Sequence, residues 1–154
     1  MRIEQHKLLA RINCKYWWHV TPIDHLAYSK RGKFFSSTYA EAEFYGRPNE
    51  QPERVTVLRP LVGDNDSVER KLFGKVLSSG NISLDGRFAL DARMKRVAMR
   101  KGYDAIVVLS RPGFLRFRHE GKLPRSMELN VLNPSRNVIP CCAHGKRSSR
   151  CAYA

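Results

Sequence analysis

The sequence of 154 residues has few cysteines, few acidic residues and no long apolar run. In its C-terminal half the longest uncharged apolar run covers residues 105–109, far short of the roughly 20 residues that cross a bilayer. The charged first residues are not followed by the apolar segment of a secretory signal. We therefore expect no membrane partner and a soluble protein in the cytoplasm of its own or a host cell.

The four cysteines argue against a small secreted domain. One is Cys14 and the other three lie in the last fourteen residues, which is no framework for paired disulfides. The last stretch also holds a histidine, so it offers four possible zinc ligands, Cys141, Cys142, His144 and Cys151. Their spacing matches no paired Cys-x₂₋₄-Cys arrangement, and we predict no metal site.

Acidic residues are scarce against the basic ones. The chain has 14 Asp and Glu against 28 Lys and Arg, a net charge of +14. Residues 1–70 carry a net +2 and residues 71–154 a net +12. This excess of positive charge favours polyanionic partners, either nucleic acid or a phosphate-bearing small molecule. It does not identify a reaction.

Hydrophobic patterning predicts one domain with strands and short helices. A hydrophobic content of 42% over this length is enough for one core. Because strands and helices do not alternate regularly, we predict an α+β fold with mostly antiparallel pairing. We assign residues 1–135 to this domain, 111–125 to a basic connector within it, and 136–154 to a loose basic tail. The pattern indicates strands at 15–20, 34–37, 55–58, 103–109 and 127–132, and helices at 40–45, 64–77 and 85–101.

Three distant segments place unusual residues on expected strands or helix ends. His19 ends an aromatic strand, Phe34 lies on a second strand, Tyr45 ends a short helix, and Glu128 lies among apolar neighbours. A glutamate in a core-like strand is costly unless it has a partner or a task. Taken singly, each residue also fits a structural role: a satisfied histidine, core aromatics, and a solvent-facing glutamate.

The order and spacing of these segments resemble the ADP-ribosyltransferases of the diphtheria-toxin and poly(ADP-ribose) polymerase type, the His-Tyr-Glu class. The likeness covers residues 16–135. Two positions depart from the family pattern, because Val20 stands where the family has Gly and Phe34 where it has Tyr. The matching stretches are His19-Val20-Thr21 for His-Gly-Ser/Thr, Gly32-Lys33-Phe34-Phe35 for Gly-x-Tyr-Phe, Tyr45, Glu128, and Gly102-Tyr103-Asp104-Ala105 as in small bacterial and phage members.

This resemblance implies a split antiparallel sheet and NAD as co-substrate. It implies that Glu128 and His19 are catalytic, with Glu128 stabilising the positive charge that develops on the ribose. The implied cofactor-binding residues are His19, Val20, Thr21, Phe34 and Tyr45. The implied activity is mono-ADP-ribosyl transfer to a macromolecule with release of nicotinamide.

The basic connector is the expected acceptor-binding segment, because phenylalanines between cations suit stacking on single-stranded bases. The acceptor is a nucleic acid or a protein. Two alternatives remain open: a non-enzymatic basic nucleic-acid-binding module, and an NAD glycohydrolase of the same superfamily. The expected acceptor-binding residues are Arg111, Phe114, Arg116, Phe117, Arg118, Lys122 and Arg125.

Overall fold

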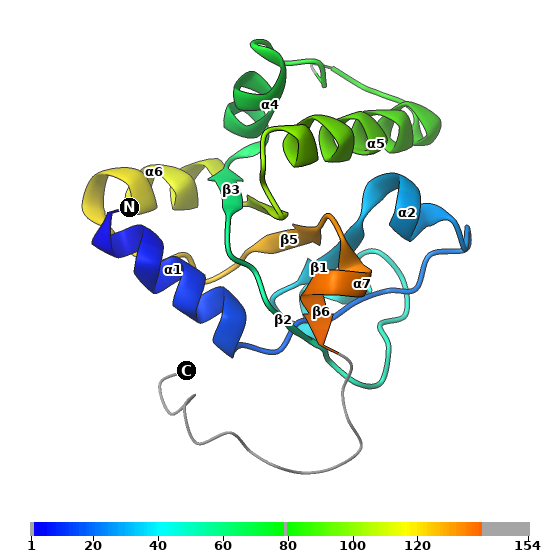
Figure 1. Ribbon diagram of the computed structural model, residues 1–154, viewed down its shortest axis with the longest axis horizontal. Coiled ribbons are helices and arrows are strands. Elements are labelled where there is room, and N and C mark those ends of the chain that lie inside the picture. The colour runs from blue at the N-terminus through cyan, green and yellow to red at the C-terminus, as the bar shows by residue number, and fades with distance from the viewer. Residues whose placement is uncertain (1, 79, 140–154) are drawn as a thin grey trace.

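The computed structural model describes residues 2–78 and 80–139, and a four-stranded sheet lies at its centre (Figure 1). The strand order is β1-β5-β4-β3. The pairs β1/β5 and β5/β4 are antiparallel, whereas β4/β3 is parallel. The α+β class with mostly antiparallel pairing is thus confirmed, and the parallel pair is a feature we did not predict. The strands are β1 Lys33–Ser36, β3 Pro60–Gly63, β4 Ala105–Val108 and β5 Glu128–Val131.

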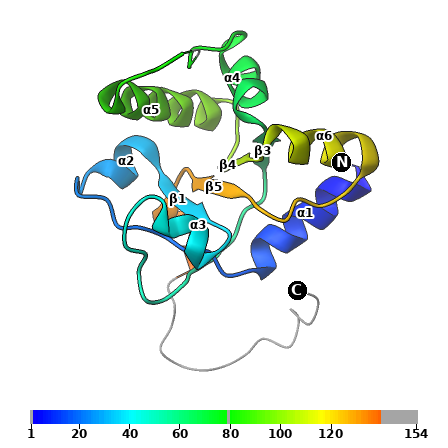
Figure 2. The same ribbon diagram turned by 180° about the vertical axis from the view of Figure 1, so that it is seen from behind.

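Helices cover both faces of this sheet. The helices α4 (Asn65–Phe73) and α5 (Leu84–Arg100) connect β3 to β4 and lie on one side (Figures 1 and 2). Their apolar residues pack against Leu61 and Ile106 in one core cluster. The helices α1 (Ile3–Cys14) and α6 (Arg111–Glu120) lie side by side in both views, away from α5.

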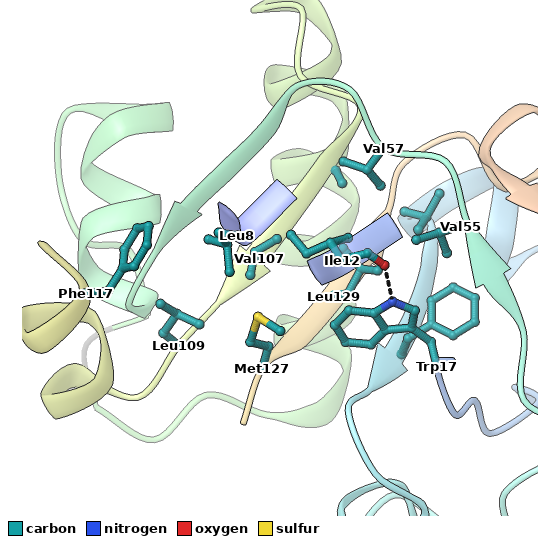
Figure 3. Packing of buried hydrophobic residues seen from close by; sticks show 13 residues of the cluster. Leu8, Ile12, Trp17, Val55, Val57, Val107, Leu109, Phe117, Met127 and Leu129 are labelled. Atoms are coloured by element: carbon teal, nitrogen blue, oxygen red, sulfur yellow. Dashed lines mark hydrogen bonds between the residues drawn. The ribbon is translucent and has the colours of Figure 1, made fainter. Parts of the chain in front are cut away.

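The second core cluster joins α1 and α6 to the opposite face of the sheet. Figure 3 shows Trp17 at one end of this cluster and Phe117 at the other. The Trp17 indole is fully buried, and its Nε1 donates to the carbonyl of Ile12 at 3.0 Å. A buried indole keeps its N–H satisfied in this way, so the tryptophan fixes the end of α1 against the sheet.

A small second sheet pairs β2 (Arg54–Val55) with β6 (Val138–Ile139). The expected strand at 15–20 is reduced to two bridges, Trp17 with Glu53 and Trp18 with Ser36, and these connect the two sheets. The short helix α7 (Pro134–Asn137) leads into β6, so residues 136–139, which we assigned to the tail, are part of the fold.

Capping residues explain where several helices begin. The side chain of Thr38 accepts from the N–H of Glu41 at the start of α3 (Tyr39–Glu43), as its sequence motif predicts. Asp64, Ser83 and Ser110 cap α4, α5 and α6 in the same way. The remaining helix, α2 (Ala27–Arg31), precedes β1 and packs against α5.

Candidate functional site

The structure brings Tyr45 and Glu128 into direct contact. Tyr45 follows α3 and Glu128 begins β5, and the Tyr45 hydroxyl donates a hydrogen bond to the Glu128 carboxylate. Partial burial, and then this bond, raise the pKa of the Tyr45 phenol well above its usual range, so the phenol stays protonated and remains a donor. Because the phenol binds one of its oxygens, the Glu128 carboxylate has a fixed orientation at the start of β5.

Phe34 lies on the same face of the sheet as Glu128. The register pairs Phe34 with Asn130 and Ser36 with Glu128, and residues two apart on a strand share a face. The Phe34 residue is 39% exposed and Tyr45 is 58% exposed. Two accessible aromatic rings therefore accompany the carboxylate.

His19 is buried and both of its ring nitrogens have partners. Its Nδ1 lies 2.6 Å from the Phe34 carbonyl oxygen and its Nε2 lies 2.7 Å from the Tyr28 hydroxyl. Because a carbonyl only accepts, Nδ1 carries the proton and donates, and Nε2 accepts from the phenol. Burial lowers the pKa of His19, against the opposing effect of the Phe34 carbonyl, so the imidazole is neutral at pH 7.

The His19 imidazole binds a strand carbonyl that a backbone N–H would bind in a regular antiparallel ladder. Trp18 and Ser36 exchange two backbone hydrogen bonds, of 3.0 and 2.8 Å. In an antiparallel ladder the next such pair would be Val20 with Phe34. Instead the His19 side chain bonds the Phe34 carbonyl, and the His19 carbonyl accepts from the N–H of Asn49. Among the described residues, the N–H and C=O of Val20 have no hydrogen-bond partner.

The side chain of Val20 packs toward the loop that carries Tyr45. A Cβ added at Gly46 would come within 3.1 Å of Cγ1 of Val20, so the glycine leaves room for the valine. Residue 20 is valine where the His-Tyr-Glu enzymes have glycine, and the backbone of Gly46 lies close to the valine side chain. It also places Val20 next to the Tyr45 segment.

Thr21 is linked to His19 through Tyr28. The Thr21 hydroxyl donates to Oδ1 of Asn49 at 2.9 Å, and it also interacts with the Tyr28 phenol. Burial raises the pKa of that phenol, which keeps it a donor to His19. Sequence reasoning missed Tyr28, because a single tyrosine in an irregular connector carries no pattern.

Two further missed residues lie on α5. Nε of Arg87 is 3.2 Å from Oδ1 of Asp91, and the Asp91 residue is only 7% exposed. Burial raises the pKa of Asp91, Arg87 and Arg31 oppose this, and the charge of Glu128 adds to the rise. The charge of Arg87 also acts on the Tyr45 phenol. Asp91 lies on the buried stripe of α5 with Met94 and Ala98, a signal that the sequence offered.

The interpretation of residues 111–125 as a connector is wrong, because Arg111–Glu120 form α6. The expected stacking role of Phe117 is wrong as well, and that of Phe114 stays a prediction. Phe117 is buried in the core and Phe114 packs against that core, since both face α1 and the sheet. The cations stay exposed, and the acceptor role of Arg111, Arg116, Arg118, Lys122 and Arg125 remains a prediction.

No three histidine, cysteine, aspartate or glutamate side chains gather as a metal site within residues 2–78 and 80–139. Cys141, Cys142, His144 and Cys151 lie outside the described residues. In the described part of the chain no helix is both long and apolar enough to cross a membrane. No family model, curated protein or solved structure matches the chain, so the geometry of these residues alone carries the functional inference.

Proposed function

We propose that the protein is an NAD-dependent mono-ADP-ribosyltransferase that passes ADP-ribose to a macromolecular acceptor and releases nicotinamide. The observation that carries this proposal is the hydrogen bond from Tyr45 to Glu128, on the sheet face where Phe34 is exposed. Three segments that are far apart in sequence supply the two aromatic rings and the carboxylate that this reaction uses. Trp17 and Trp18 join the four-stranded sheet to the small second sheet, and these two sheets are the feature of the fold on which the proposal draws.

The free groups of the site suit NAD. A primary carboxamide needs one donor and one acceptor, and Val20 offers an N–H and a C=O without partners among the described residues. The exposed rings of Phe34 and Tyr45 suit a flat heteroaromatic ring. Phe34, which stands where the His-Tyr-Glu class has tyrosine, lacks the hydroxyl but keeps the aromatic ring that can stack. NAD supplies a C–N glycosidic bond whose leaving group is neutral nicotinamide.

Glu128 provides the electrostatic part of catalysis. Cleavage of a glycosidic bond places positive charge on the ribose, and an anionic carboxylate close to it lowers the energy of that state. The Tyr45 hydroxyl holds one carboxylate oxygen, which leaves the other for the ribose. His19 keeps the N–H of Val20 unpaired, because its Nδ1–H satisfies the Phe34 carbonyl that Val20 would otherwise bind, and Tyr28 holds the imidazole by donating to Nε2.

The test is NAD consumption by the wild-type protein and by Glu128→Gln. Loss of one fixed charge aimed at a transition state typically costs about 10²- to 10³-fold in rate, and we expect a loss of that size. Glu43→Gln is the matched control, because Glu43 is an exposed carboxylate on α3. A melting temperature close to wild type shows that the fold is intact. Turnover by Glu128→Gln within a few-fold of wild type contradicts the assigned role.

Transfer and hydrolysis are separated by the fate of the ADP-ribose. Label from NAD that becomes attached to macromolecules in a lysate supports a transferase, and label found only as free ADP-ribose supports a glycohydrolase. The non-enzymatic alternative predicts no NAD consumption. One of its two expected stacking residues is not accessible, because Phe117 lies in the core, and Phe114 is partly buried against that core.

A further inference from the structure

A pocket of about 560 Å³ lies where α4 and α5 begin, and it is open to solvent. We call it the α4–α5 pocket. It is lined by neutral polar side chains, by two apolar ones and by one arginine, including Asn65, Ser78, Asn81, Ile82, Leu84 and Arg87. Gly63, which directly precedes the cap of α4, is in register with Val108, and Val108 with Glu128. The pocket is therefore at the same end of the sheet as Glu128.

Arg87 belongs both to this pocket and to the surroundings of the Tyr45–Glu128 pair. Its charge acts on the Tyr45 phenol, and its side chain lines the pocket. Oδ1 of Asp91 lies 3.2 Å from Nε, and the Arg87 side chain is 38% exposed, so part of the guanidinium faces solvent. A guanidinium that a buried carboxylate orients is preorganised to bind an oxyanion with its remaining donors.

The chemistry of the lining selects between acceptor classes. None of the described side chains that line the pocket is acidic, so a lysine or arginine side chain of a protein acceptor would find no counter-charge. A phosphate finds Arg87, and the amides of Asn65 and Asn81 offer the donors and acceptors that pair with base edges. The net charge of +14 favours a polyanion over a cationic peptide.

From this geometry we infer that the α4–α5 pocket is the acceptor subsite and takes an unpaired nucleotide of a nucleic acid, with a phosphate on Arg87. This rests on the proposed function. The bond between the nicotinamide nitrogen and ribose C1′ breaks, and its electron pair leaves on nicotinamide. A bond forms between C1′ and a nitrogen or oxygen of the nucleotide, whose proton passes to solvent.

The first experiment measures binding without NAD. A fluorescein-labelled, mixed-sequence single-stranded oligonucleotide is titrated with the full chain, and anisotropy is followed at several salt concentrations. We expect Arg87→Ala to weaken binding by about tenfold or more and to reduce the log–log salt slope by about 1. The matched control is Arg96→Ala, an exposed arginine on the same helix that lies outside the pocket. An equal loss in both variants overturns the subsite.

The second experiment measures the ratio of labelled oligonucleotide to free ADP-ribose formed from NAD. We expect Arg87→Ala to lower this ratio by about tenfold or more. Asn81→Ala, which leaves the Arg87–Asp91 pair intact, should lower it too, and this protects the result against a folding defect at Arg87. A ratio unchanged in both variants overturns the subsite. Transfer to proteins alone, with no oligonucleotide binding, overturns the acceptor class. If the wild type consumes no NAD, the proposed function fails, while the binding experiment still decides whether the pocket takes a nucleotide.

Discussion

The charge of His19 follows from its surroundings. The imidazole is 5% exposed and lies between the Phe34 carbonyl and the Tyr28 phenol, neither of which is charged. Burial has the largest effect on its pKa and lowers it below the ordinary value of 6.5. Lys33 acts in the same direction and Glu53 in the opposite one. A histidine held this way is neutral when the protein is folded and must gain a proton when the chain unfolds in acid.

This protonation makes stability depend on pH with a definite sign. Below pH 6.5 the unfolded chain binds the proton that the folded protein excludes, so the free energy of unfolding falls as the pH is lowered. One such group contributes a slope of at most about 1.4 kcal/mol per pH unit. We expect His19→Gln to remove this part of the slope between pH 7.5 and 5.5 in urea denaturation. Identical slopes in the two proteins would show that His19 is protonated without penalty.

Among the secondary-structure elements, those with strong local signals could be predicted. The Thr38 cap predicts α3, and Gly102, which has φ +84°, lies where the sequence predicts a left-handed residue after α5. The helix α6 was missed because Pro112 and Gly113 look like loop residues. In fact Ser110 caps the helix, and proline is favoured in a first turn.

The site could be predicted in part. Glu128 is recognisable because it is a charged residue in an apolar strand, whereas Tyr45 was singled out only by the resemblance to the His-Tyr-Glu class and lies two residues after the end of α3. Tyr28 was not found, because its partner His19 is set by packing of an irregular segment rather than by a spacing rule. Arg87 and Asp91 are an i,i+4 pair on α5, a spacing that the sequence offered but that does not distinguish a site from an ordinary helix ion pair. The parallel pairing of β3 with β4 likewise depends on how α4 and α5 cross the sheet, which local patterns do not encode.

The start of β1 requires glycine at residue 32, because two conditions exclude a side chain there. Its φ is +89° with ψ of −173°, a region that essentially only glycine occupies. A Cβ would also meet the backbone oxygen of Val131 at 2.8 Å and would overlap Oδ1 of Asn130. The turn into the strand that carries Phe34 therefore depends on this glycine.

We expect Gly32→Ala to lower the free energy of unfolding by roughly 2–5 kcal/mol, from backbone strain and overpacking together. Gly74→Ala is the matched control. Gly74 also has a positive φ, of +77°, but nothing lies within 4 Å of an added Cβ, so we expect a loss of about 1 kcal/mol. Chemical denaturation of the two variants provides the comparison. Equal losses would mean that β1 and β5 separate without cost to accommodate the methyl group.

At the scale of the whole molecule, the two adjacent tryptophans hold the two sheets together. Trp17 bridges to Glu53 beside β2, and Trp18 bridges to Ser36 in β1. Trp17 is fully buried, whereas Trp18 is half-buried and packs edge-on against Tyr39 at 5.1 Å between ring centroids. The first is part of the core, and the second lies on its margin.

We expect Trp17→Ala to cost about 3–5 kcal/mol of stability, because a fully buried indole leaves a large cavity. The same change removes the donor to the Ile12 carbonyl. Trp18→Ala should cost less than half as much, because part of that ring is already in water. Thermal and urea unfolding measured on both variants test this order. A larger loss at Trp18 would contradict the conclusion that Trp17 is the tryptophan that belongs to the core.

The central position of β5 has a consequence for how the protein is made. This strand lies between β1 and β4, and it pairs Lys33 with Val131 across most of the chain. While the ribosome is still adding residues before Glu128, the nascent polypeptide has neither the carboxylate nor the strand that connects the two halves of the sheet. A fragment truncated anywhere before this strand would therefore lack the central strand of the four-stranded sheet. The two halves of the sheet can be joined only after synthesis has passed Val131.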